Sequence, residues 1–441
     1  MGRKVFISVL GFSNYGYCHY VKGSFKSSNV RFIQEATLDY LQTLEQWTTD
    51  DIAYVLLTNE AEQANWLDNG HIDRNTGQTI SCEGLSTCLS AMNFPFPIET
   101  INHIPHGNNE TEIWEIFEKL FTKLQDGDEL YFDLTHGFRY LPMLIMVLIN
   151  YSKFLKQTLV RSITYGNYES RNKYNEAPII DLLPLSALQD WTYAAGQFLD
   201  SGNVQRLVKL GNKSLSPILR VAKGDNMEAT NLKKFLNLLN NNIEDIQTCR
   251  GINIVESKNL KDLILQANQL QSTIIKPLNP VFEKIKEQFN DFSEEPDVKN
   301  GFIAARWCVN NGLYQQAITI LQENIVTYIC QRQGLDYKNE FERGLVNKTF
   351  VIYQEQKNEE EWMFSSLHSI EEIESQKIVI RKLLQEEQLQ KLSSSFMVCT
   401  NIRNDFNHAG MRSNPAKATQ LKERIKERIT KVMDIINDCN E

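Results

Sequence analysis

The chain has 441 residues and a formal net charge of -9. The length predicts two or three domains. The acidic balance argues against a protein that coats nucleic acid nonspecifically, because such binding needs many Lys and Arg, but it leaves room for a small local nucleic-acid site. The eight cysteines form no CxxC pair, which favours neither a disulfide framework nor a zinc site and predicts reduced thiols in the cytoplasm.

Membrane insertion and secretion are not expected. The most apolar window, Leu141 to Ile149, is far shorter than the roughly 20 residues that span a bilayer. The first residues, MGRKVFISVLGF, lack a signal-peptide cleavage pattern and are typical of a first buried strand.

The first half alternates between short strand-like segments and helix-like segments. An apolar series from Ile113 to Leu124 has the i, i+3, i+4, i+7 spacing of one helix face. Such alternation predicts a mostly parallel, Rossmann-like α/β domain over residues 1–190. The predicted strands are Val5 to Leu10, Val30 to Ala36, Ala53 to Thr58, Glu129 to Leu134 and Val160 to Tyr165.

The second half is dominated by helical periodicity, which predicts an all-α region. A polar break from Ser293 to Asp297 divides it into residues 191–295 and 296–441. A strong helix is predicted from Gly301 to Arg332, and further helices from Leu383 to Cys399 and from Pro415 onward.

The segment Tyr131 to Pro142, YFDLTHGFRYLP, combines a buried strand, a polar loop and a helix start. Open α/β sheets bind phosphate-bearing ligands at such an edge. Asp133, at the strand end, is expected to organise the loop by accepting backbone hydrogen bonds. The predicted ligand contacts are Thr135, His136, Gly137 and Arg139.

Two other strand ends are predicted to meet this edge. The loop after the first strand, Gly11 to Gly16, lacks the Lys and Ser/Thr of a Walker motif and does not match GxGxxG. In a parallel sheet, this loop and Thr58 after the third strand converge with Thr135, which favours a ligand site over plain turns.

The second candidate site is Arg403-Asn404-Asp405-Phe406-Asn407-His408, between two predicted helices. Histidine suits general acid/base work, and arginine can bind phosphoryl oxygens, so the pair could promote metal-free RNA cleavage. Alone the pair is more typical of a surface arginine and a capping histidine. On a regular helix the two would stand about 140° apart, so one helix face would not present both. A composite site, in which two copies of the motif meet across a dimer, is one solution.

With these motifs, the chain resembles the CRISPR-associated CARF-HEPN ribonucleases of type III systems. Asp133-Leu134-Thr135-His136-Gly137 fits the DxTHG signature of their N-terminal CARF domain. Arg403 to His408 fits the RX4H signature of their C-terminal HEPN domain, and the helix that carries Glu323 is similar to the HEPN helix beside the motif.

The resemblance implies a CARF domain at 1–190, a helical connector at 191–295 and a HEPN helical bundle at 296–441. It implies a homodimer or higher homo-oligomer that binds a cyclic oligoadenylate, either cyclic tetra-adenylate or cyclic hexa-adenylate, as an allosteric activator. The activated dimer would degrade single-stranded RNA without a metal or other cofactor. The implied catalytic residues are Arg403, Asn404 and His408, and the implied messenger contacts are Gly11, Phe12, Ser13, Asn14, Thr58, Thr135, His136, Gly137 and Arg139.

Two alternatives remain open. The helical half could bind a protein or DNA partner, which would make the chain a CARF-type regulator or adaptor. The CARF domain could also cleave its own cyclic oligoadenylate, which is compatible with RNA cleavage elsewhere in the chain.

Overall fold

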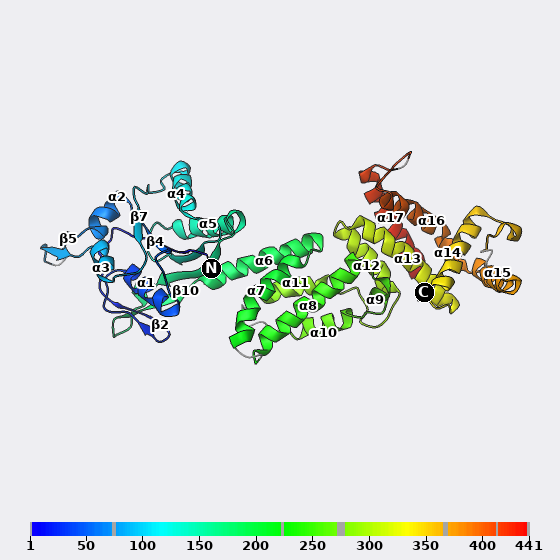
Figure 1. The fold of residues 1–441 in the computed structure, drawn as a ribbon, viewed down its shortest axis with the longest axis horizontal. Helices are drawn as coiled ribbons and strands as arrows, with labels where there is room; N and C mark the ends of the chain where they lie inside the picture. Colours follow the sequence, from blue (N-terminus) through cyan, green and yellow to red (C-terminus); the bar gives the residue numbers. More distant parts are fainter. Residues whose placement is uncertain are drawn as a thin grey trace. The chain divides into compact units, whose positions relative to one another are not determined.

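The computed structural model describes residues 2–72, 76–221, 225–270, 278–364, 369–411 and 413–438. The chain divides into two compact units, Met1–Ala187 and Leu188–Glu441 (Figure 1). The first is an α/β unit and the second is all-helical, as the sequence predicts. The second unit contains both predicted helical domains, and their separation near residue 296 stays a prediction.

The described residues of the N-terminal unit form an eight-stranded mixed sheet of order β3-β2-β10-β9-β8-β1-β4-β7. The strands β7, β4, β1, β8 and β9 run parallel, whereas β10 is antiparallel to β9. A separate hairpin pairs β5 (Asn69–Ile72) with β6 (Thr79–Cys82). The sheet strands are β1 Lys4–Val9, β2 His19–Lys22, β3 Phe25–Lys26, β4 Ile52–Leu56, β7 Ile98–Ile101, β8 Glu129–Asp133, β9 Leu159–Gly166 and β10 Glu176–Asp181.

Helices cover both faces of this sheet, because the central strands are apolar on both sides. Val5 and Ile7 of β1 pack in the core beneath α4 and α5, while Phe6 packs in the core beneath α1 and α3. The helices of this unit are α1 Ile33–Leu44, α2 Asn59–Ala61, α3 Leu85–Ala91, α4 Glu110–Lys123 and α5 Leu141–Leu155, with a π-helical turn at Glu62–Trp66 and a 3-10 turn at Tyr168–Ser170.

Four of the five predicted strands are confirmed, but the strand predicted from Val30 to Ala36 is wrong. Val30 makes only an isolated bridge to Cys18, and α1 begins at Ile33. The Glu35 carboxylate accepts the Phe32 backbone N–H at 3.1 Å, a helix-start contact. A short apolar run cannot be distinguished from a buried helix by periodicity alone, and this contact is what the pattern did not reveal.

The helices of the C-terminal unit share one large apolar core that includes Trp191, Phe235, Leu321 and Phe396. The unit boundary falls inside α6. The helices are α6 Leu183–Ser201, α7 Gln205–Val221, α8 Met227–Gln247, α9 Gly251–Val255, α10 Leu260–Asn268, α11 Asn279–Glu287, α12 Lys299–Asn310, α13 Tyr314–Gln333, α14 Glu340–Glu355, α15 Ile370–Leu384, α16 Glu387–Asn407 and α17 Ala418–Asn437, with a 3-10 turn at Glu359–Glu361.

The single helix predicted from Gly301 to Arg332 is wrong, because the chain turns between α12 and α13. Gly312 has a φ of 75°, a left-handed conformation that ends helices and that glycine adopts without a steric penalty. The break lets α12 fold back against α13 as an antiparallel neighbour. The predicted helix from Leu383 to Cys399 also ends too early. In the structure, α16 extends through Asn407 and contains most of the Arg403 motif.

Candidate functional site

The loops that follow β1, β4 and β8 line one cavity of about 530 Å³ at the carboxyl edge of the sheet. β1 lies between β4 and β8 in the sheet, so the chain order reverses here, as at the ligand sites of open α/β sheets. Asn14 is exposed and is not part of the lining. The predicted contact residues that do line the cavity are Gly11, Phe12, Ser13, Thr58, Thr135, His136, Gly137 and Arg139.

Asp133 organises the floor of this cavity, as the sequence predicts. Its fully buried carboxylate accepts the Ser8 hydroxyl at 2.7 Å, the Thr135 hydroxyl at 2.5 Å and the Thr135 backbone N–H at 3.3 Å. Burial raises the pKa of Asp133 to about 6, against the lowering effect of these hydrogen bonds. Asp133 therefore supports the loop from below and does not face the ligand space.

The Thr135 hydroxyl is already engaged within the protein. It donates to Asp133 and accepts the Gly166 backbone N–H at 2.7 Å. This pair of bonds ties the loop after β8 to the end of β9. Thr135 lines the cavity, but the structure assigns its hydroxyl first to holding the loop.

His136 is held by a ring partner that the sequence analysis did not identify. Its ring stacks on the ring of Tyr15, with centroids 4.1 Å apart. Desolvation lowers the pKa of His136 to about 4, so the imidazole is neutral near pH 7. It can offer one donor or one acceptor to a ligand, but no charge.

Gly137 has a φ of 119° and lies close to two apolar side chains. A Cβ at this position would stand 2.8 Å from Leu141 Cδ2 and 3.2 Å from Val9 Cγ1. Any other residue would therefore be strained in backbone and packing alike. Glycine allows the loop to run directly over β1 into α5.

Two buried polar side chains fix the loop after β1. Asn65 donates to the carbonyls of Gly11 and Ser13 at 2.8 and 2.9 Å, and its own oxygen accepts from Arg31 at 2.9 Å. Arg31 also donates to the Tyr15 carbonyl at 3.4 Å. Both side chains come from outside the predicted loops, so no local sequence signal could have identified them.

The outer rim of the cavity carries a cation and an aromatic ring. Arg139 is exposed, and it has no acidic partner among the residues that the structure describes. Phe12 is 57% exposed. The cavity thus combines a cation and backbone N–H groups for an anion with an aromatic surface on which a planar group can stack.

The second candidate site lies at the end of α16. Arg403 is half-buried, and its Nη1 donates to Gln322 Oε1 at 3.0 Å and to Glu323 Oε1 at 2.7 Å on α13. Both contacts use Nη1, which leaves Nε and Nη2 without a protein partner among the described residues. Gln322 is a contact that the sequence analysis missed, because packing of α13 against α16 creates it.

His408 is the C-cap residue of α16 and is exposed, like Asn404. The motif therefore lies in and just beyond the last helical turn, and not between helices as predicted. The turn after it places Ala409 and Gly410 at positive φ. Arg403 contacts α13 and His408 is exposed, and no hydrogen bond joins the two among the described residues.

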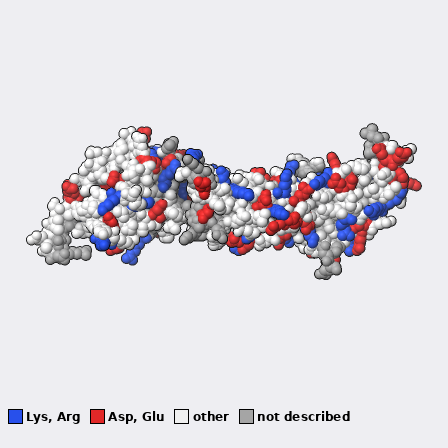
Figure 2. Space-filling view, turned by 90° about the horizontal axis from the view of Figure 1, so that it is seen from below, with Lys and Arg blue, Asp and Glu red and all other residues white. Residues whose placement is uncertain are grey.

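Exposed cations accompany this motif on α17, where Lys422, Arg424, Lys426 and Lys431 lie on the surface. Arg412, a further basic residue that follows the motif in the sequence, lies outside the described residues. Figure 2 shows acidic and basic side chains interspersed over the face in view, with no single basic field. This distribution fits local rather than broad contact with polyanions.

Across the described ranges, no group of three or more His, Cys, Asp and Glu side chains is placed to hold a metal ion. No helix among the described residues is long and apolar enough to cross a bilayer.

Comparison with known proteins identifies the N-terminal unit. Residues 5–169 match the family model of the CARF domain of the CRISPR system endoribonuclease Csx1. Residues 187–297 match the model of the second domain of CRISPR-associated protein MJ1674. The first match ends at residue 169, and the second begins at residue 187, at the boundary between the compact units.

A relative is the CRISPR-associated protein MJ1674 of Methanocaldococcus jannaschii, which is 25% identical over 253 residues. The alignment covers 55% of this chain but 36% of the relative, so the chain spans little more than a third of the relative's length. Both family models and the relative are CRISPR-associated, and the cavity lies within the segment that matches a CARF domain. The chain is therefore a CRISPR-associated CARF protein.

Proposed function

We propose that this protein is an endoribonuclease that a cyclic oligoadenylate activates in type III CRISPR antiviral defence. The CARF domain would bind the messenger, and the helical unit would cleave single-stranded RNA without a metal ion. The observation that carries this proposal is the cavity at the carboxyl edge of the sheet, inside the segment that matches the CARF domain of a CRISPR endoribonuclease.

The chemistry of the cavity suits part of an adenylate ring. The Arg139 guanidinium and the backbone N–H groups around Gly137 can bind phosphate oxygens, while Phe12 offers a surface for an adenine base. Neutral His136 would hydrogen-bond to the ligand without adding charge. A ring of adenylates is compatible with two-fold symmetry, so two such cavities could hold one ring between two copies.

The exposed face of α5 supports pairing with a second copy. This helix begins at the rim of the cavity, and four of its apolar side chains follow each other along one exposed face. They are Met143, Val147, Tyr151 and Phe154, with exposed fractions of 72%, 51%, 45% and 83%. An exposed apolar stripe of this kind is typical of an interaction surface. We assign it to the homodimer.

The proposed reaction needs no group beyond the RNA and the protein. The ribose 2'-hydroxyl attacks the neighbouring phosphorus, the bond to the 5'-oxygen breaks, and the products carry a 2',3'-cyclic phosphate and a 5'-hydroxyl. His408 would move the protons. The free Nε and Nη2 edge of Arg403 would stabilise the charge on the phosphoryl oxygens, and exposed Asn404 would help to bind them. Since Arg403 contacts α13 and His408 is exposed, the site would combine motifs from two copies.

Activation requires that the messenger favours the paired arrangement of the two motifs over the resting one. The helices between the CARF domain and α13 would transmit this preference.

The test is cleavage of a labelled single-stranded RNA in EDTA, titrated with cyclic tetra-adenylate and cyclic hexa-adenylate. We expect one ring to stimulate cleavage, and we expect His408→Ala and Arg403→Ala to abolish it with messenger affinity nearly unchanged. Arg332→Ala is the matched control, since Arg332 also pairs with a glutamate in this unit, at 2.9 Å from Glu386.

Two results would count against the proposal. Messenger binding without RNA cleavage would indicate a regulator or adaptor. A requirement for divalent metal would exclude the proposed chemistry. Recovery of the ring after long incubation separately reports whether the CARF domain degrades its own ligand.

A further inference from the structure

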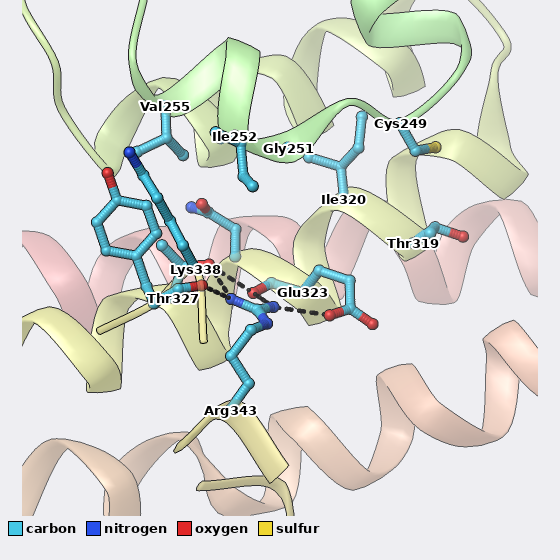
Figure 3. A pocket seen from close by; sticks show the side chains of 13 residues that line it. Cys249, Gly251, Ile252, Val255, Thr319, Ile320, Glu323, Thr327, Lys338 and Arg343 are labelled. Atoms are coloured by element: carbon cyan, nitrogen blue, oxygen red, sulfur yellow. Dashed lines mark hydrogen bonds and ion pairs between the residues drawn. The ribbon is translucent and has the colours of Figure 1, made fainter. Parts of the chain in front are cut away.

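One carboxylate in the C-terminal unit is shared by two arginines. Glu323 Oε1 accepts from Arg403 at 2.7 Å, and Glu323 Oε2 accepts from Arg343 at 2.7 Å. Figure 3 shows the Arg343 guanidinium reaching from α14 to Glu323 on α13. Arg343 belongs to neither of the sequence motifs, and it approaches Glu323 from a different helix than Arg403 does.

Arg343 is itself held firmly. Besides Glu323 Oε2, its guanidinium donates to the Glu323 backbone carbonyl at 3.0 Å, to the Thr327 hydroxyl at 2.8 Å and to the Tyr337 carbonyl at 3.2 Å. Its side chain is only 20% exposed. A planar guanidinium with four such bonds has a defined orientation. The Arg343 guanidinium therefore has a fixed position, and its ion pair with Glu323 can orient the Glu323 carboxylate.

Packing alone does not hold the Glu323 side chain. The side chain is 45% exposed. It also lines a cavity of about 220 Å³ together with Thr319, Ile320 and Asn324 (Figure 3). Its carboxylate has room to turn away from α16 into this space. The ion pair with Arg343 is what keeps Oε2 on one side and leaves Oε1 to face Arg403.

We infer that Arg343 is a positioning residue for Arg403 and acts through Glu323. The inference rests on the proposed ribonuclease function. Arg343 orients the carboxylate, the carboxylate binds Nη1 of Arg403, and Nε and Nη2 of Arg403 are thereby presented to the phosphate. A displacement of about 1 Å in a catalytic group can lower a rate by about a hundredfold, so this orientation bears on catalysis more than on stability.

The main variant is Arg343→Lys, which keeps the charge but cannot bind Glu323, Thr327 and Tyr337 at once. At saturating messenger, we expect kcat for RNA cleavage to fall by about tenfold to a hundredfold. KM for RNA and the half-activating messenger concentration should change by less than about twofold, because Arg343 contacts neither ligand. Arg332→Lys, at the similar pair with Glu386, should leave kcat unchanged.

A double-variant cycle with Glu323→Ala separates positioning from general damage. If Arg343 acts through Glu323, Arg343→Lys lowers kcat no further in the Glu323→Ala background. If kcat of the double variant falls by the product of the two single-variant factors, the inference is overturned. A loss of kcat that follows a fall in melting temperature would also overturn it. So would an Arg343→Lys enzyme as active as Arg332→Lys.

A readout that does not depend on cleavage is the modification of Arg403 by phenylglyoxal, followed by mass spectrometry. We expect faster modification in Arg343→Lys than in the unsubstituted protein or in Arg332→Lys, because Arg403 loses its fixed partner. An unchanged rate would overturn the positioning role. If the unsubstituted protein cleaves no RNA, the proposed function fails, whereas normal cleavage with an unaffected Arg343→Lys defeats this inference alone.

Discussion

The rings of Tyr15 and His136 stack with 4.1 Å between their centroids and 27° between their planes. This contact joins the loop after β1 to the loop after β8 across the floor of the cavity. Burial of His136 lowers its pKa to about 4, so Arg139 supplies the positive charge at the rim.

Removing this stacking should weaken messenger binding. An aromatic pair contributes about 0.5 to 1.5 kcal/mol beyond its buried area, so we expect Tyr15→Ala to lower affinity by roughly twofold to tenfold. Tyr15→Phe keeps the ring and should bind nearly as well as the unsubstituted protein. Isothermal titration calorimetry with the activating ring measures both. Equal losses in the two variants would mean that the hydroxyl, and not the stacking, matters.

The charge of Arg139 should contribute directly to messenger affinity. Hydrogen bonds to charged groups contribute about 1.5 to 3 kcal/mol, so Arg139→Gln should weaken binding by roughly tenfold or more. The affinity of the variant should also depend less on salt. Arg161→Gln is the control, because Arg161 pairs with Glu129 at 2.8 Å on the sheet and does not line the cavity. A comparable loss in Arg161→Gln would indicate a nonspecific effect of charge.

The stability of the CARF domain should depend on pH through two opposing groups. The pKa of Asp133 is raised from 3.8 to about 6, so its stabilising contribution is present at low pH and is lost as pH rises through 6. The pKa of His136 is lowered from 6.5 to about 4, so its contribution is present at neutral pH and is lost as pH falls toward 4. Between pH 4 and 6, the changes that Asp133 and His136 make to the free energy of unfolding have opposite signs and largely cancel.

Substituting Asp133 or His136 should reveal how the remaining group makes the stability of the domain depend on pH. Relative to the unsubstituted protein, Asp133→Asn should become progressively less stable as pH falls from 6 to 4. His136→Gln should become less stable as pH rises over the same range, with each effect on the order of 3 kcal/mol. Urea unfolding at several pH values measures this. Parallel curves for all three proteins would contradict the prediction.

The apolar stripe on α5 should be needed for self-association. Met143→Glu combined with Val147→Glu places two like charges on the proposed dimer surface, and we expect the dimer Kd to rise at least about tenfold. Messenger-stimulated RNA cleavage should fall with it. Leu44→Glu is the control, since Leu44 is also exposed, at 59%, but lies on α1. Sedimentation velocity compares the three proteins, and an unchanged dimer in the double variant would place the interface elsewhere.

The order of the units and most of the central strands could be predicted from local sequence patterns. Buried parallel strands such as Val5 to Leu10 are almost continuously apolar, and a proline in the first turn of α5 marks a helix start, so both can be read locally. The grouping of Gly11, Thr58 and Thr135 at one edge also followed from the sequence, because the carboxyl ends of parallel strands share an edge.

The side chains that support these sites are brought together by packing between elements that are far apart in the sequence. Asn65 and Arg31 meet the loops of the cavity from distant segments, Tyr15 of one loop stacks on His136 of another, and Arg343 reaches Glu323 from a separate helix. Their contacts depend on how helices and loops pack, and no spacing or periodicity encodes them. The helix break at Gly312 and the start of α1 at Ile33 have local causes, because one glycine and one capping contact outweighed an apolar pattern.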